Sequence, residues 1–237
     1  MTWSIIARDA TTRRIGIAVA TRFFAVGARV PHIKTGVGAV ATQAMTNPYF
    51  GPRGLALLGA GAAADEAVRM LLSADEGRAH RQLHVMDRQG RVAAATGADC
   101  IPWCGHIAGA TWSLAGNMLA GEAVLSETAR VYEANLTMPF ARRLLTAMHA
   151  GEAAGGDKRG KQSAALLIHD DEDHAMLDLR VDDHVEPLQE LTRLEAVSRE
   201  RFIHHRRFGP MAANEFGLLD RAALETAIKA SIEEGYE

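Results

Sequence analysis

The sequence predicts a layered α+β protein in which two antiparallel sheets stack and helices cover both outer faces. Strand-like and helix-like stretches form long separate blocks, in the order strands, helices, strands, helices, strands. The strand-like stretches come mostly in neighbouring pairs with short polar connections, which is typical of antiparallel hairpins. With 237 residues and 48% hydrophobic content, the chain can bury a full core. Together these observations favour a layered architecture.

The first block predicts three strands. Residues 2–7 and 15–20 are apolar runs around the polar segment Asp9-Ala10-Thr11-Thr12-Arg13, which predicts a hairpin. Residues 36–44 form a third short strand that ends before Asn47-Pro48.

The next block predicts two helices and a second hairpin. Leucine and alanine recur at helical spacing from Pro52 to Ala74, with an interruption near Gly59 and Gly61. Residues 82–87 and 91–96 are then joined across a short turn, and residues 111–115 add a strand.

The last part of the chain predicts a second helical pair, a third hairpin and two further helices. The pair covers residues 122–134 and 140–150, the hairpin covers residues 163–169 and 176–181, and the helices cover residues 188–207 and 220–234.

Composition excludes several classes of function. The net charge is −3 and the isoelectric point is about 6.4, which argues against a nucleic-acid or anionic-membrane partner and favours a small-molecule substrate. We expect a cytoplasmic protein, because the sequence shows neither a leader peptide nor a long apolar run. Cys100 and Cys104 lack the spacing of a redox or zinc motif, so we expect reduced thiols and neither a metal nor a cofactor.

Thr2 is the strongest candidate for a catalytic residue. It follows Met1 and opens the first strand, and aminopeptidases remove an initiator methionine that precedes a small residue. The freed α-amine, with an ordinary pKa of about 7.7 to 8.0, would serve as the base for the neighbouring hydroxyl. Many proteins begin with Met-Thr, however, so the interpretation depends on the rest of the chain.

Several motifs resemble the domain-of-unknown-function 1028 family, which belongs to the superfamily of N-terminal nucleophile hydrolases. The resemblance extends from Thr2 to about Leu194. The motifs are Thr2-x-Ser4-Ile5-x-Ala7-Arg8-Asp9, Arg22-Phe-Phe-Ala-Val-Gly27, Gly36-Val-Gly-Ala-Val-Ala-Thr-Gln43, Gly51-Pro-Arg-Gly54, Cys100-Ile-Pro-Trp103, Gly116-Asn117, Ala154-Gly-Gly-Asp-Lys-Arg-Gly-Lys-Gln-Ser-Ala164 and Asp178-Leu-Arg-Val-Asp-Asp-His184.

The resemblance implies a four-layer αββα sandwich over residues 1–194. Residues 195–237 would form a helical extension that packs on the same domain or on a partner subunit of a homo-oligomer. In bile-salt-hydrolase-like members of the superfamily, an arginine at the end of the second strand contacts nucleophile and substrate, which implies that role for Arg22. A surface arginine is the alternative.

Other polar residues are candidates for the same site. Gln43 and Asn117 carry amide groups near strand ends and are candidate oxyanion donors, with ordinary hydrogen bonding as the alternative. The loop from Gly155 to Ser163 could bind an anion or form a tight turn. The candidate substrate-binding residues are Gln43, Asp157, Arg159, Gln162, Ser163 and Asp182, although Asp182 is also placed to cap a helix.

Three functions remain open at this stage. The leading hypothesis is an N-terminal-nucleophile amidohydrolase that cleaves a non-peptide C–N bond in a small anionic metabolite, with Thr2, Arg22 and Asn117 as catalytic residues. The second keeps the fold without the nucleophile, as in a cyclohydrolase. The third is an oligomer that binds a small metabolite.

Overall fold

The computed structural model describes residues 2–236, so Met1 and its predicted removal lie outside the described residues. The chain divides into two compact units between Leu191 and Thr192. The larger unit contains both sheets and every candidate site residue.

The first sheet has six antiparallel strands in the order β10-β9-β2-β1-β8-β7, with the first hairpin of the chain at its centre. Trp3 of β1 pairs with Ala20 of β2 and with Gly116 of β8. The strands are β1 (Thr2–Arg8), β2 (Ile15–Thr21), β7 (Gly105–Ala108), β8 (Trp112–Asn117), β9 (Ser163–His169) and β10 (Leu177–Val181).

The second sheet has four antiparallel strands in the order β3-β4-β5-β6. Its two central strands are paired over seven residues, from Gly38 opposite Asp87 to Ala44 opposite Arg81. The strands are β3 (Pro31–Lys34), β4 (Gly38–Ala44), β5 (Arg81–Asp87) and β6 (Val92–Thr96).

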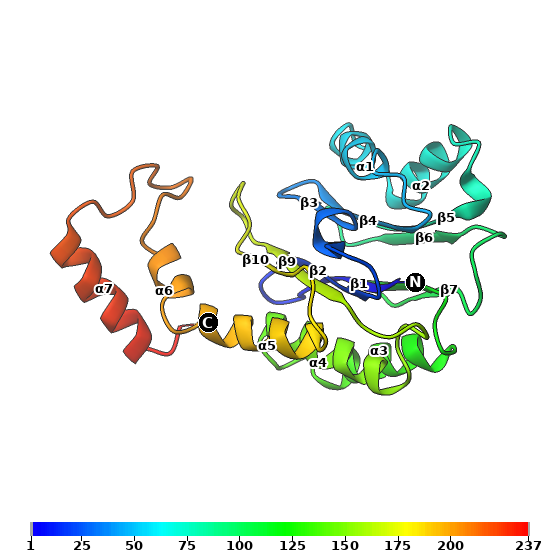
Figure 1. Ribbon diagram of the computed structural model, residues 1–237. Helices are drawn as coiled ribbons and strands as arrows, with labels where there is room; N and C mark the ends of the chain where they lie inside the picture. The colour runs from blue at the N-terminus through cyan, green and yellow to red at the C-terminus, as the bar shows by residue number, and fades with distance from the viewer. Residues whose placement is uncertain (1, 237) are drawn as a thin grey trace. The chain divides into compact units, whose positions relative to one another are not determined.

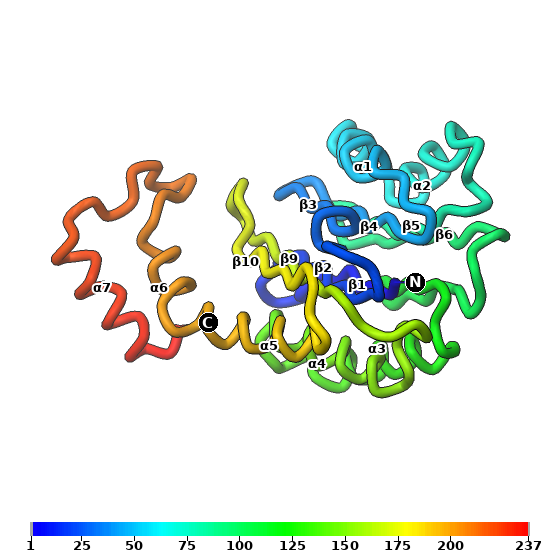
Figure 2. Tube along the Cα trace, viewed as in Figure 1, coloured from blue at the N-terminus to red at the C-terminus, as the bar shows by residue number. Residues whose placement is uncertain are grey.

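Helices cover the outer face of each sheet (Figures 1 and 2). α1 (Phe50–Gly59) and α2 (Ala64–Ser73) pack on the four-stranded sheet, and α3 (Ala123–Ala134) and α4 (Phe140–Ala153) pack on the six-stranded sheet. The predicted four-layer αββα sandwich is therefore confirmed.

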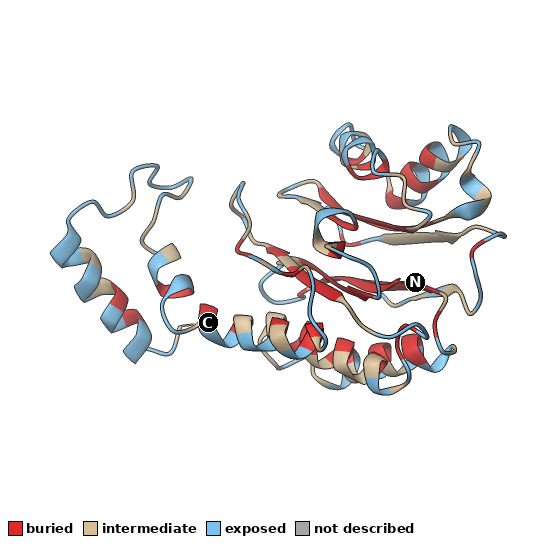
Figure 3. Cartoon of the chain, viewed as in Figure 1, coloured by how far each residue is buried: buried red, intermediate tan, exposed pale blue. Residues whose placement is uncertain are grey.

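The space between the sheets is filled by residues from alternate strand positions, because successive side chains of a strand point to opposite faces. Ile6 and Ile17 of the six-stranded sheet pack here against Ala39 and Met86 of the four-stranded sheet. The central strands are buried along nearly their whole length (Figure 3). This packing fixes which side chains of β1 face the second sheet.

The structure differs from the sequence prediction in two short strands and in the division of one helix into two. β3 and β7 have four residues each and were not predicted, because so few residues carry no clear alternation. The helix expected over residues 188–207 is instead α5 (Pro187–Ser198) followed by α6 (Phe202–Arg206). Arg201 takes a non-helical conformation between them although the helical pattern of the sequence continues.

The smaller unit ends in a helical hairpin of α6 and α7 (Arg221–Glu233). Asp220 caps α7 by accepting a hydrogen bond from the Ala223 amide. Ile203 and Ile228 are buried within this unit.

Candidate active site

Thr2 begins β1 at the centre of the six-stranded sheet, and its side chain faces the second sheet. It is 8% exposed, and its hydroxyl lies 3.1 Å from the hydroxyl of Thr21 at the end of β2. Ser4 and Ile6 point to the same side, as strand alternation requires. The candidate nucleophile is therefore held at the rim of the space between the sheets.

The carbonyl oxygen of Thr2 is held by two side-chain amides from different strands. Gln43 Nε2 on β4 donates to it over 3.4 Å and Asn117 Nδ2 on β8 over 3.5 Å. Each of these nitrogens also donates to Gln82 Oε1, over 2.8 Å and 2.9 Å. An amide nitrogen carries two protons, so both donors are already engaged and hold the Thr2 backbone in place.

Gln82 on β5 is the centre of this amide cluster, and sequence reasoning did not identify it. Its Nε2 shares two protons among three acceptors, Thr96 Oγ1 and the carbonyl oxygens of Gly105 and Gly116, which lie 2.8 to 3.1 Å away. The side chain is fully buried. The available signal was a pair of polar residues, Gln82 and His84, that alternate with the apolar Leu83 and Val85 inside the strand.

A second group of polar side chains continues the network between the sheets. Ser4 Oγ donates to Gln43 Oε1 over 2.7 Å and lies 2.9 Å from His84 Nε2, and His84 Nδ1 lies 3.2 Å from Ser113 Oγ. Burial lowers the pKa of His84 to about 3, despite the opposing effect of Ser113. The network is therefore uncharged near neutral pH.

Thr2 also lines a cavity of about 170 Å³. Arg29 supplies its charged group and is exposed, whereas Val26 and Val30 are buried. The sequence reasoning did not include Arg29, which lies in the connection between β2 and β3. The cavity, called the Thr2 pocket below, is lined by Thr2, Phe23, Val26, Arg29, Val30, Ala44 and Thr46.

Backbone strain accumulates around the Thr2 pocket. Ala44 lines the pocket with a φ of 64°, Ala25 precedes Val26 with a φ of 55°, and Met118 follows Asn117 with a φ of 54°. A left-handed conformation costs about 1 to 2 kcal/mol for a residue other than glycine. Such strain gathers at functional sites, so these three positions support a functional interpretation of this end of the sandwich.

Arg22 is not among the described residues that line the Thr2 pocket. Its guanidinium donates to Gln162 Oε1 over 3.1 Å, and its backbone amide donates to Asp157 Oδ2 over 2.7 Å. Gln162 in turn donates to Asp183 Oδ1 over 3.0 Å. The arginine follows Thr21 in sequence, but its exposed side chain joins a different cluster.

The remaining predicted residues hold the segment from Arg22 to Val26 in place. Ser163 Oγ donates to the Phe23 carbonyl and accepts from the Val26 amide, and the Asp182 carbonyl accepts from the Ala25 amide over 3.0 Å. Since Phe23 and Val26 line the Thr2 pocket, these residues support its wall.

The carboxylates of Asp157 and Asp182 are both engaged by arginines. Asp157 is buried and also accepts from the Arg159 backbone amide and guanidinium, over 2.8 Å and 3.2 Å. Arg180 binds the Asp182 carboxylate through both oxygens.

Of the nine predicted site residues, only Thr2, Gln43 and Asn117 lie together between the sheets.

The glycine-rich loop borders a separate cavity of about 120 Å³ on the helix-facing side of the six-stranded sheet. Trp3, Gly156 and Lys161 are among the residues that line it. Lys161 forms ion pairs with Glu152 and Glu186, at 3.1 Å and 2.5 Å. An anion in this cavity would therefore compete with two carboxylates for the lysine.

Residues 2–236 contain no group of three or more histidine, cysteine or acidic side chains placed to bind a metal ion. Cys100 and Cys104 are both free thiols, and burial raises the pKa of each. None of the helices in the described part of the chain has the length and apolar character needed to span a bilayer.

The fold and site define an αββα sandwich with a buried threonine at the head of a central strand. The model of the "Family of unknown function (DUF1028)" matches residues 2–191. The chain therefore belongs to this family, which confirms the resemblance carried by the sequence motifs.

One solved structure agrees with this assignment, and two others are more distantly similar. Protein SPO2555 from Silicibacter pomeroyi, described as a DUF1028 protein, is 33% identical with a TM-score of 0.86, over 93% of this chain and 96% of that chain. Anbu (ancestral beta-subunit) from Yersinia bercovieri is 12% identical with a TM-score of 0.42, over 83% and 94% of the two chains. An Anbu (Gly-1) mutant from Hyphomicrobium sp. strain MC1 is 14% identical with a TM-score of 0.43, over 85% and 96%. No curated protein matches the chain.

Proposed function

We propose that this protein is an N-terminal-nucleophile amidohydrolase that cleaves the C–N bond of a small, anionic, non-peptide amide. The observation that carries the proposal is the position of Thr2: its side chain lies at the head of the central strand and lines a cavity that also contains an arginine. The proposal requires that processing frees the α-amine of Thr2.

The reaction would proceed through an ester on Thr2. The hydroxyl oxygen attacks the substrate carbonyl carbon while the α-amine takes the hydroxyl proton. The resulting ammonium gives this proton to the leaving nitrogen, the C–N bond breaks, and the acyl group remains on Thr2. Water, activated by the same amine, then hydrolyses the ester and releases the acid.

Gln43 and Asn117 act as positioning residues in this proposal. Their donors are already used by the Thr2 carbonyl and by Gln82, so they fix the strand that carries the nucleophile. The Thr21 hydroxyl, 3.1 Å from that of Thr2, orients the attacking oxygen. Such fixed geometry lowers the entropic part of the barrier.

Arg29 supplies the recognition of an anionic substrate. It is the only charged residue among the described residues that line the Thr2 pocket, and guanidinium groups bind carboxylates through two parallel hydrogen bonds. A cavity of about 170 Å³ suits a small metabolite. We give Arg22 the role of supporting the pocket wall through its contacts with Asp157 and Gln162.

The test is a hydrolysis screen with protein whose free Thr2 amine has been verified by mass spectrometry. The panel contains N-acetyl and N-carbamoyl amino acids, with matched neutral amides that lack the carboxylate. We expect turnover of anionic members only. Thr2→Ala should lower turnover at least about a thousandfold, whereas Thr2→Ser should retain it. Thr226→Ala, which removes an exposed hydroxyl from α7, is the matched control.

Two outcomes would contradict the nucleophile mechanism. Undiminished turnover by Thr2→Ala would show that Thr2 is not the nucleophile, as in the cyclohydrolase alternative, which keeps the scaffold without it. Saturable binding without any product would favour a metabolite-binding protein. Sedimentation velocity on the same samples tests the predicted homo-oligomer.

A further inference from the structure

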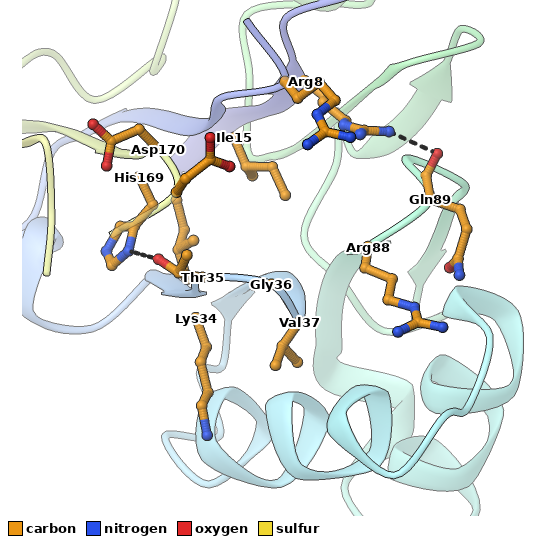
Figure 4. A pocket seen from close by; sticks show the side chains of 13 residues that line it. Arg8, Ile15, Lys34, Thr35, Gly36, Val37, Arg88, Gln89, His169 and Asp170 are labelled. Atoms are coloured by element: carbon orange, nitrogen blue, oxygen red, sulfur yellow. Dashed lines mark hydrogen bonds between the residues drawn. The ribbon is translucent and has the colours of Figure 1, made fainter. Parts of the chain in front are cut away.

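We propose that a second cavity, at the opposite end of the sandwich from Thr2, binds a small anion with two or more negative charges. This hairpin-end cavity has a volume of about 330 Å³ and is formed where four hairpin turns meet (Figure 4). The turns are residues 9–14 between β1 and β2, 35–37 between β3 and β4, 88–91 between β5 and β6, and 170–176 between β9 and β10.

Positive charge dominates the lining of this cavity. Four of the lining residues carry a positive charge, Arg8, Arg13, Lys34 and Arg88, and two carry a carboxylate, Asp170 and Asp171. None of these four cations forms an ion pair with another residue between Thr2 and Tyr236. The whole chain has a net charge of −3, so this grouping of cations is local.

The carboxylates next to these cations in the sequence are engaged elsewhere. Asp9 forms a buried ion pair with Arg143 of α4 and also accepts hydrogen bonds from the 11–12 segment. Asp87 pairs with Arg91 over 2.7 Å. Arg8 and Arg88 are therefore left without the counter-ions that their own turns could have supplied.

The turns and strand ends that carry the cations are joined by hydrogen bonds. Arg8 Nη1 donates to the Gln89 carbonyl over 3.0 Å, which joins the end of β1 to the third turn, and Figure 4 shows this bond. Thr35 Oγ1 lies 2.9 Å from His169 Nδ1 and donates to the Glu172 carbonyl, which joins the second turn to the fourth. A site whose frame is already ordered loses less entropy when a ligand binds.

The rest of the lining indicates what the ligand looks like. Ile15, Ile33 and Val37 provide apolar surface between the charged groups. Arg13 adopts a left-handed backbone conformation with a φ of 61°, a strain of the kind that concentrates at functional positions. We infer a ligand with a small apolar or ring body and phosphate or carboxylate groups, both of which guanidinium groups bind.

This site is separate from the Thr2 pocket. Thr2 and Arg8 are the two ends of β1, and six steps of about 3.3 Å each place them about 20 Å apart. The proposal therefore does not depend on the proposed hydrolase activity.

Isothermal titration calorimetry of the full chain, with sodium pyrophosphate and sodium citrate as probes, tests the proposal. We expect binding at one site. The affinity should fall as salt rises from 20 to 300 mM, because the screening length between exposed charges shortens from roughly 20 Å to roughly 5 Å. Arg8→Gln and Arg88→Gln should each weaken binding by about tenfold. Asp171→Asn should tighten it, because the substitution removes a negative charge from the lining.

Arg69→Gln on α2 is the matched control, since it removes the same charge from an exposed position outside the cavity. Absence of binding by the wild type would overturn the proposal. So would equal weakening by Arg69→Gln and Arg88→Gln. Because Asp171→Asn is expected to tighten binding, a folding defect cannot imitate the predicted result. Binding of pyrophosphate alone supports a phosphorylated ligand, and binding of citrate alone supports a polycarboxylate.

Discussion

The two ends of the sandwich differ in how their polar side chains are partnered. At the Thr2 end, amide, hydroxyl and imidazole groups are buried and hydrogen-bonded to one another, and the only charge lining the described pocket is Arg29. At the hairpin end, four cations line the cavity, and the carboxylates next to Arg8 and Arg88 in the sequence, Asp9 and Asp87, pair with other arginines. The first arrangement positions a backbone, and the second leaves charge available for a ligand.

The difference has an energetic consequence. Buried polar groups cost free energy when a partner is removed, whereas exposed charges contribute little to folding. Substitutions of the buried polar groups at the Thr2 end should therefore affect stability strongly. Substitutions of the exposed cations at the hairpin end should affect ligand binding while leaving stability nearly unchanged.

The buried ion pair behind the hairpin end should give the largest loss of stability. Arg143→Met leaves the Asp9 carboxylate without its buried partner, and we expect a decrease of about 3 to 5 kcal/mol in the free energy of unfolding. Urea denaturation at pH 7 measures it. Arg130→Met, which removes an exposed pair with Glu127, should change the free energy of unfolding far less, because solvent screens the pair. Similar losses for the two variants would contradict this ranking.

Gln82→Ala should have the next largest effect. It leaves the amide protons of Gln43 and Asn117 and the carbonyls of Gly105 and Gly116 without their partner, for a cost of roughly 2 to 4 kcal/mol. The same urea experiment measures this cost. Gln89→Ala, in the hairpin-end cavity, should stay within about 0.5 kcal/mol of the wild type. If Gln82→Ala were equally neutral, the amide cluster would not hold the Thr2 end together.

The Thr2 end should also lose stability as the pH falls. The pKa of His84 is about 6.5 in the unfolded chain and about 3 in the folded protein, because the ring is buried. The unfolded state therefore binds a proton below about pH 6.5 while the folded state does not, so this contribution to stability is present above pH 6.5 and declines toward pH 3. The slope is at most about 1.4 kcal/mol per pH unit.

Urea titrations between pH 7 and 4.5 check this dependence, with His84→Gln as the variant and the exposed His174→Gln as its control. His84→Gln should flatten the curve and His174→Gln should not. A His84 ring that titrates near pH 6.5 in the NMR spectrum would show that the ring is not held neutral.

The smallest effect on stability is expected when a cation at the hairpin end is replaced in the protein without ligand. Arg88→Gln removes an exposed charge that has no ion-pair partner in the described chain, so the change in unfolding free energy should stay below about 0.5 kcal/mol. Thermal unfolding without ligand measures this change. A loss comparable to that of Gln82→Ala would mean that the cation serves folding.

The sequence allowed the fold to be predicted better than the site. Three hairpins and the helices on the two sheets follow from local periodicity, and the layered order follows from the separate strand and helix blocks together with the family motifs. The short strands β3 and β7 were not predicted. The amide cluster that holds the Thr2 carbonyl contains Gln43, Gln82 and Asn117, and these side chains meet only after the two sheets have stacked. No local pattern reports such contacts, and Gln82 was therefore missed.

The arginines illustrate the same limit. Arg22 was placed near Thr2 because it follows the strand that pairs with β1, yet its side chain contacts Gln162. Arg29 lines the Thr2 pocket because the chain turns through Val26 and returns, a path set by Ser163 and by the left-handed Ala25. Side-chain direction at a strand end depends on such tertiary contacts.

In the proposed mechanism, the free amine of Thr2 serves as the base for its own hydroxyl. The most direct test is an intact-mass measurement on the sample that shows amide hydrolysis, combined with N-terminal sequencing. We predict a mass short by one methionine and a sequence that begins Thr-Trp-Ser. Full activity in a sample that retains Met1 on every molecule would contradict the claim.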